Sequence, residues 1–171
     1  MTTSTSTLSD LTELTSHYLQ TEVEVRVADV TRNLNPRAEG TYTVKVRNAD
    51  APRGIRLHDV TVHIKASSDV VQLSANAPTM LETRAGGSRS EPLLPDDALV
   101  QELYVFFPDV STGVEPNDVL EPGEELAFDM PYRANRRGTA QITAHVHASF
   151  LTTDLFPRTN GPSNGKDVTV G

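Results

Sequence analysis

The sequence predicts an all-β protein built as an antiparallel β-sandwich, and three observations support this. Apolar residues recur at every second position in several segments, which is the period of a strand with one buried face. Clusters of Pro, Gly, Asn and Asp separate those segments, as turns do in all-β domains. The hydrophobic fraction is only 37%, which favours sheets with one wet face over a parallel sheet covered by helices.

Residues 1–20 are predicted to form an arm that contains one short helix. Apolar side chains recur at helical spacing over residues 8–19. A helix of this length is marginal in isolation, so it must dock on something. It packs either across one end of its own sandwich or against a neighbouring subunit. The helical positions that would make this contact are Leu8, Leu11, Leu14 and Tyr18.

Residues 21–171 are predicted to form a single sandwich domain, because a chain of 171 residues suits one domain of ordinary size. Alternation directs one side chain in two toward the interior of each strand. The residues predicted to face inward are Val23, Val25 and Val27; Tyr42, Val44 and Val46; Val60, Val62 and Ile64; Leu126, Phe128, Met130 and Tyr132; and Ile142, Ala144, Val146, Ala148 and Phe150. A short apolar run at Val70–Leu73 and a last strand at Asp167–Val170 complete the prediction.

Residues 75–97 break this rhythm and predict a long insertion. The segments "ANAP", "AGGSRS" and "EPLLPDD" carry the Pro, Gly and Ser of an extended excursion, with a short strand expected at Met80–Thr83. Loops of this length in compact domains are usually functional or disordered. After the insertion, "LVQELYVFF" predicts one well-buried strand over residues 99–107. An acidic stretch at 109–124 follows, and Gly123 permits the turn that begins the next strand.

Two segments resemble known modules. "LNPRAEGTYTVKVRNAD" (34–50) resembles the opening hairpin of bacterial and archaeal CARDB-like immunoglobulin-like modules, and "LEPGEELAFDMPYRANRRGTAQITAHVHA" (120–148) resembles their closing half. The resemblance covers about a third of the chain and implies an immunoglobulin-like antiparallel sandwich; a jelly roll is the alternative architecture, because strand number alone does not separate the two. It also implies a non-catalytic adhesion or spacer role. The arm and the long insertion depart from those modules and favour a part of an assembly.

The acidity of the chain is concentrated in one region. The net charge is −8, yet eleven Asp and Glu residues and no Lys or Arg lie between Arg89 and Arg133. Nucleic acid is disfavoured as a partner, because phosphate binding needs clustered basic groups. The acidic stretch is interpreted as a solvated loop, with a site for a cation or a basic partner as the alternative.

The compartment is predicted from what the sequence lacks. No apolar run approaches the ~18 residues of a membrane span, so no membrane partner is expected. The first residues, "MTTSTSTLSD", have neither the basic start nor the apolar core of a secretory signal. There is no cysteine, which excludes disulfides and Cys-based metal sites. We therefore expect a cytoplasmic or particle-associated protein.

Two metal sites are considered. His145 and His147 share one face of a strand, and His63 lies on the outward face of another, so a three-histidine site is conceivable; the alternative is a set of solvent-facing histidines. The acidic stretch offers oxygen donors for calcium, which needs about 6–8 converging oxygens, although "DVSTGVEPND" does not fit the EF-hand spacing. No resident cofactor is predicted, and calcium stays the open possibility. Its candidate donors are Asp109, Glu115, Asn117, Asp118 and Asp129.

The sequence predicts that the protein is not an enzyme. It contains no Gly-x-Ser-x-Gly elbow, no Ser-x-x-Lys pair and no glycine-rich nucleotide loop. It has no Trp and only five Phe and four Tyr, several of which the core requires. Few rings are therefore left to stack on sugars, which weakens a carbohydrate-binding interpretation.

The predicted function is a structural or protein-binding subunit of a larger assembly, such as a phage virion or a related bacterial particle. The alternative is a calcium- or metal-dependent ligand-binding module, of the adhesion or carbohydrate-binding type. The expected partner is protein, by self-association or with another subunit, and edge strands offer a further route by strand addition. The residues predicted to contact a partner are Leu11, Leu14 and Tyr18 in the arm, Arg84 and Arg89 in the insertion, and Asp109, Glu115 and Asp118 in the acidic stretch.

Overall fold

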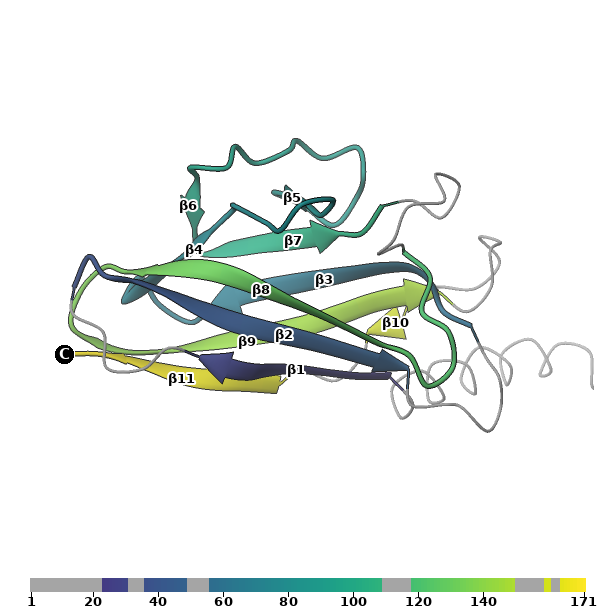
Figure 1. Ribbon diagram of the computed structural model, residues 1–171. Helices are drawn as coiled ribbons and strands as arrows, with labels where there is room; N and C mark the ends of the chain where they lie inside the picture. Colours follow the sequence, from purple (N-terminus) through teal and green to yellow (C-terminus); the bar gives the residue numbers. More distant parts are fainter. Residues whose placement is uncertain (1–22, 31–35, 49–55, 109–117, 150–158, 161–163) are drawn as a thin grey trace, which may run out of the picture.

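The computed structural model describes residues 23–30, 36–48, 56–108, 118–149, 159–160 and 164–171. Within these residues it contains eleven strands and no helix. The strands form two stacked sheets in which neighbouring strands run antiparallel (Figure 1). The arm predicted over residues 1–20, with its helix, lies outside the described residues. The described residues form no helix long and apolar enough to cross a membrane.

Strand order identifies the sandwich as immunoglobulin-like rather than a jelly roll. The order β1-β2-β8-β4 in one sheet and β11-β9-β3 in the other matches the A-B-E-D and G-F-C arrangement of that fold. The first sheet comprises β1 (Val23–Val30), β2 (Glu39–Asn48), β8 (Glu125–Ala134), β4 (Val71–Ser74) and β6 (Leu99–Val100). The second comprises β10 (Thr159–Asn160), β9 (Gly138–Ser149), β3 (His58–Ala66), β7 (Glu102–Phe106) and β5 (Glu82–Arg84), and β11 (Asn164–Val170) also pairs with β9.

The buried faces of the central strands confirm the alternation predicted from the sequence. In β2 the exposed fractions of Tyr42, Val44 and Val46 are all 0%, and Lys45 between them is half-buried. The same pattern holds along β3, β8 and β9, whose inward side chains join one core between the sheets. In β8, Leu126 is half-buried. The inward positions expected at Val23, Val25, Val27 and Phe150 lie outside the side chains that the structure describes.

The turn that precedes β8 has the geometry expected from its glycine. Gly123 has φ of 80°, in the left-handed region that glycine adopts without steric cost. Its N–H donates to the carbonyl of Asn48 over 2.8 Å, and the N–H of Asn48 donates to the carbonyl of Glu124 over 3.0 Å. The turn therefore sets the register in which β8 pairs with β2.

The strand predicted over residues 99–107 is two strands, and this expectation was wrong. Leu99 and Val100 form β6 beside β4 in the first sheet, whereas β7 lies beside β3 in the second. Gln101 makes the crossing, because its side-chain amide donates to the carbonyl of Val71 and its own carbonyl accepts from the N–H of Ala66. An apolar run that passes between two sheets looks the same in sequence as one buried strand.

The insertion runs along the β7 edge of the sandwich and contains β5 (Figure 1). The short strand expected at Met80–Thr83 begins two residues later and ends one residue later, at Glu82–Arg84. Met80 has φ of 79° and a side chain 46% exposed, so it belongs to a turn rather than to a strand.

Candidate protein-interaction surface

The insertion forms a compact loop over β7. β5 pairs with β7, and Arg84 makes an isolated bridge with Leu93, so that residues 84–93 fold back on themselves. The N–H of Ala85 donates to the carbonyl of Pro92 and closes this loop. At its tip, a side chain at Gly87 would meet the ring of Tyr104 at 3.1 Å, so the glycine lets the loop lie flat on β7.

Phe106 is the platform on which two arginines of the insertion rest. It follows Val105, which faces the core, so its ring emerges on the outer face of the second sheet; yet it is only 2% exposed. The guanidinium carbons of Arg84 and Arg89 lie 5.6 Å and 5.4 Å from the centre of this ring. Cation–π contacts of this kind are worth about 0.5–1 kcal/mol each at exposed sites and more where water is excluded. The insertion therefore covers an aromatic ring that would otherwise face solvent.

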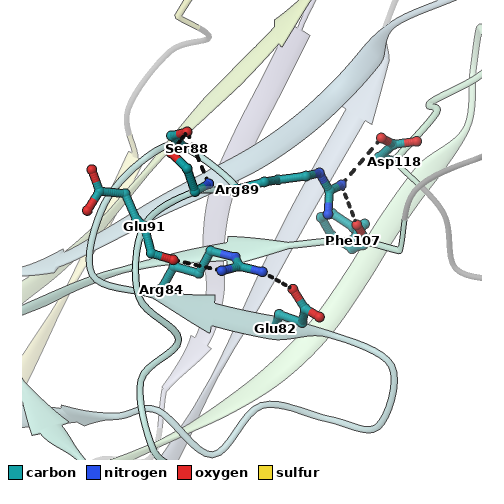
Figure 2. A network of polar contacts seen from close by, with 8 residues as sticks. Glu82, Arg84, Ser88, Arg89, Glu91, Phe107 and Asp118 are labelled. Atoms are coloured by element: carbon teal, nitrogen blue, oxygen red, sulfur yellow. Dashed lines mark hydrogen bonds and ion pairs between the residues drawn. The ribbon is translucent and has the colours of Figure 1, made fainter.

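Arg84 ties the two ends of the loop together (Figure 2). Its Nη1 donates to the carbonyl of Glu91 over 2.7 Å, and its Nη2 donates to the carboxylate of Glu82 over 2.8 Å. Its Nε is buried without a hydrogen-bond partner. A buried donor without a partner costs free energy, so the contacts of the rest of the guanidinium must outweigh that cost.

Arg89 fastens the insertion to the end of β7 and to the acidic stretch. Its Nη2 donates to the carbonyl of Phe107, just after β7, over 2.7 Å, and to the carboxylate of Asp118, within the stretch, over 3.4 Å (Figure 2). These two segments are also joined directly, because the N–H of Asp118 donates to the carbonyl of Pro108 over 2.9 Å. The side chain of Asp118 is only 5% exposed, against 38% for Arg89. One guanidinium thus joins two segments that lie 29 residues apart in the sequence.

Exposed apolar side chains gather in the same part of the chain. Among the described residues the exposed large hydrophobic side chains are Met80, Leu93 and Leu99, with exposed fractions of 46%, 56% and 37%. All three belong to the insertion or to β6, which follows it. Exposed apolar side chains are a feature of surfaces that bind partners.

The structure brings together some of the predicted contact residues and not others. Arg84 and Arg89 share the Phe106 platform, and Arg89 joins Asp118 to the insertion. Asp118 is buried in this contact, so its carboxylate anchors the insertion through Arg89. The remaining predicted residues, Leu11, Leu14, Tyr18, Asp109 and Glu115, lie outside the described residues.

The three histidines considered for a metal lie on one face of the second sheet. His63 faces His145 directly across the β3–β9 pair, with ring centres 6.2 Å apart, and His147 lies at 6.5 Å. On its other side His63 stacks on Tyr104 at 4.2 Å, and its Nε2 lies 3.2 Å from the carboxylate of Glu102. Within the described part of the chain, no three His, Asp or Glu side chains converge closely enough to hold a metal ion.

On this face of the second sheet, the pKa of His145 is shifted by its surroundings. Burial lowers the pKa of His145, and the positive charges of His63 and Lys65 lower it further. The neutral ring is therefore favoured near neutral pH.

Among the oxygen donors considered for calcium, Asp118 is engaged in the ion pair with Arg89.

Sequence reasoning missed Phe106 and the exposed apolar side chains of the insertion and β6. The adjacent Phe106 and Phe107 carry the signal, because two neighbouring residues of a strand cannot both face the core. Phe107 is the core residue, and it meets Phe128 edge-on at 5.7 Å. An aromatic residue directed outward needs a cover, and the insertion supplies it.

Comparison with solved structures confirms the immunoglobulin-like sandwich. The third cohesin ScaC of Acetivibrio cellulolyticus, in complex with the ScaB dockerin, matches with a TM-score of 0.50 at 8% identity, over 86% of this chain and 98% of that one. The CARDB domain of the PF1109 protein from Pyrococcus furiosus, in complex with di-metal ions, matches with a TM-score of 0.44 at 13% identity, over 88% of each chain.

A third similar structure belongs to a longer protein. BcpA, the major pilin subunit of Bacillus cereus, matches with a TM-score of 0.49 at 10% identity, over 87% of this chain and 40% of the pilin. Identities this low show the fold alone. No protein-family model matches the chain, and no curated protein matches it in sequence.

Proposed function

We propose that this chain is a non-enzymatic protein-binding module that serves as a structural subunit or surface component of a larger assembly, such as a phage virion or a related bacterial particle. The observation that carries the proposal is that the exposed large hydrophobic side chains of the described residues, Met80, Leu93 and Leu99, all belong to the insertion or to β6. Arg84 and Arg89 fix the loop that presents Leu93. A surface that is already ordered loses less conformational entropy on binding, which favours affinity.

The fold is compatible with such a role. The cohesin of the same fold is described in a complex with a dockerin, which is a protein partner. Fold analogy is an associational argument, so it supports the class of function and leaves the partner to experiment. A location in the cytoplasm or within a particle belongs to the same proposal.

The first experiment tests the apolar surface. Met80→Ser, Leu93→Ser and Leu99→Ser are combined in one variant, and Gln141→Ser with Asp167→Ser serves as an exposed polar control on β9 and β11. Both variants and the wild type are measured by size-exclusion chromatography with light scattering and by photo-crosslinking from position 90. We expect the wild type and the control, but not the apolar variant, to show a mass above the 18.6 kDa of one chain or one defined crosslinked partner.

The opposite result would remove the proposal. A wild-type protein that stays at the mass of one chain and yields no defined crosslink argues against it. So does an apolar variant that associates as well as the wild type. Circular dichroism on all three proteins shows that any loss reflects the surface rather than the fold.

A further inference from the structure

One edge of β8 has no strand beside it over much of its length. β2 pairs with β8 along residues 125–133, whereas β4 pairs with it only along residues 132–134. Among the described strands, none continues β4 beside residues 125–130. An unpaired edge presents backbone N–H and C=O groups that can bind another chain.

The hydrogen bonds at the two ends of β8 show which residues face this edge. At one end the N–H of Asn48 donates to the carbonyl of Glu124, and at the other the N–H of Ala134 donates to the carbonyl of Ala38. Residues of an antiparallel strand alternate between bonding to one neighbour and to the other. The register between β2 and β8 is unbroken, so the even-numbered residues of β8 bond to β2.

The odd-numbered residues therefore direct their backbone groups toward the open edge. Pro131 agrees with this parity, because proline has no N–H to donate and lies at an odd position. Ala127 and Asp129 are the next odd positions along the open part. Both side chains are exposed, and no backbone hydrogen bond from either residue to the insertion is found.

An apolar groove lies directly beside these backbone groups. Its volume is about 360 Å³, within the range of pockets that bury ligands. Leu126 and Phe128 line it from β8, and Phe107 lines it from the end of β7. The insertion forms the opposite wall with Pro78, Thr79 and Leu81. A strand laid along β8 would thus meet backbone partners on one side and apolar side chains beneath.

We propose that this groove is a strand-addition site for an extended segment of a partner protein in which Lys or Arg alternates with apolar residues. The inference rests on the proposed function and specifies a way of binding. The added strand exchanges hydrogen bonds with Ala127 and Asp129. Its apolar side chains pack on Phe107 and Phe128, and its basic side chains lie on the outer face beside the carboxylates of Glu125 and Asp129.

Charge selects this occupant over the N-terminal residues of the chain itself. Glu125 and Asp129 are exposed, and the bases paired with this part of β8, Lys45 and Arg47, lie on β2, on the far side of β8 from the open edge. Residues 1–22 contain three carboxylates and no Lys or Arg, so they would add repulsion at this edge. Opposite charges placed across neighbouring strands stabilise the pairing, whereas like charges destabilise it.

The first test uses hydrogen exchange followed by nuclear magnetic resonance. In the free protein we expect the amides of Ala127 and Asp129 to exchange at least tenfold faster than those of Phe128 and Met130. The probe is the capped heptapeptide Lys-Val-Lys-Val-Lys-Val-Lys, and its addition should slow the exchange at Ala127 and Asp129. Two control peptides, one with Glu in place of Lys and one with N-methylated valines, should bind at least tenfold more weakly.

The second test uses a matched pair of substitutions at one position. Ala127→Pro removes the N–H that faces the groove and leaves the bonds to β2, whereas Ala127→Thr keeps the N–H. We expect Ala127→Pro to weaken peptide binding at least tenfold and Ala127→Thr to leave it within twofold. Asp129→Asn should weaken it a few-fold and reduce its dependence on salt.

Three results would overturn the inference. The edge is closed if Ala127 and Asp129 in the free protein are as protected as their even-numbered neighbours, and this holds even if Ala127→Pro fails to fold. Binding lies elsewhere if Ala127→Pro binds the peptide like the wild type, or if the N-methylated peptide binds as well as the parent. Crosslinking from position 90 is read separately, so the apolar surface can stand while the groove fails, or the reverse.

Discussion

The β2–β8 pair and the insertion belong to one domain but are held in place by different interactions. Along β2 and β8 every second side chain enters the core, and the pairing continues for nine residue pairs. From Asn76 to Ala98, only Thr83 has a fully buried side chain. Two arginines and the Phe106 platform hold the insertion in place instead.

This difference separates stability from recognition. Apolar burial is non-directional and contributes most of the free energy of folding. The polar contacts of the insertion are directional, and each contributes only about 0.5–1.5 kcal/mol net, or up to about 3 kcal/mol when a charged group takes part. A region held in this way can be altered or opened without unfolding the sandwich. The five predictions below compare the effects of changes in these regions.

The largest effect is expected in the core. Phe128→Ala should lower the free energy of unfolding by about 3–5 kcal/mol, because the ring is 7% exposed and packs edge-on against Phe107. Glu125→Ala, at an exposed position of the same strand, is the control and should change stability little. Urea denaturation followed by circular dichroism measures both. A loss below about 1 kcal/mol for Phe128→Ala, the size of an ordinary surface effect, would contradict the assignment of this ring to the core.

A smaller effect is expected where the insertion is fastened. Arg89→Ala should cost about 1–2 kcal/mol, because it removes a charged hydrogen bond to Phe107 and an ion pair that solvent partly screens. In a double-mutant cycle with Asp118→Asn the coupling should be about 0.5–1 kcal/mol. Arg136→Ala is the control, because its ion pair with Asp69 is more than half exposed on both sides and should have no measurable effect.

Hydrogen exchange in the Arg89→Ala variant shows whether Arg89 stabilises only the insertion or the whole domain. If Arg89 holds only the insertion, hydrogen exchange should speed up within residues 82–94 and stay unchanged along β2. Faster exchange along β2 at the same denaturant concentration would mean that the insertion and the core unfold as one unit. The insertion would then not be held independently of the core.

Much of the sandwich could be predicted from the sequence, because its signal is local. The alternation in Tyr42, Val44 and Val46, or in Val60, Val62 and Ile64, depends only on neighbouring residues and on one buried face. The crossing at Gln101 and the pairing of Arg89 with Asp118 depend on segments far apart in the chain. Neither the two-residue period of a strand nor the 3.6-residue period of a helix encodes such contacts, so the candidate surface could not be predicted from the sequence. The open edge of β8 likewise depends on where β4 stops.

A change within the core should stabilise the protein. The hydroxyl of Tyr42 is buried without a partner, and this burial raises the pKa of Tyr42. Tyr42→Phe removes the unsatisfied group and should raise the free energy of unfolding by about 1 kcal/mol. Tyr132→Phe is the control and should bring no gain, because the Tyr132 hydroxyl is not among the buried unpaired groups.

The same tyrosines give the core a defined response to alkali. Burial raises the pKa of Tyr132 to about 12 and that of Tyr42 as well. A group whose pKa is higher in the folded state loses its contribution to stability as the pH rises above the pKa in the unfolded chain, near 10. Wild-type stability should therefore fall above pH ~10, and Tyr42→Phe should fall less steeply. Equal slopes in alkaline urea titrations would contradict the burial of the Tyr42 hydroxyl.

The smallest effect is expected on the outer face of the second sheet, where neither the core nor the insertion dominates. The pKa of His145 is lowered by burial and by the positive charges of His63 and Lys65. The unfolded chain then binds the proton more readily than the folded one. The free energy of unfolding should therefore decrease as the pH falls below about 6.5, the ordinary pKa of histidine. We expect the melting temperature to drop about 1 °C less between pH 7.5 and 5.5 in His145→Gln than in the wild type.

His58→Gln is the control for this prediction, because it lies on β3, several residues from the His63–His145 contact. It should keep the wild-type dependence on pH. If His145→Gln also keeps that dependence, neither the burial of His145 nor the charges of His63 and Lys65 lower its pKa. If His145→Gln reduces the drop in melting temperature between pH 7.5 and 5.5 by more than a few degrees, this face is more tightly packed than its half-buried side chains indicate. It would then join the core rather than stand between the core and the insertion.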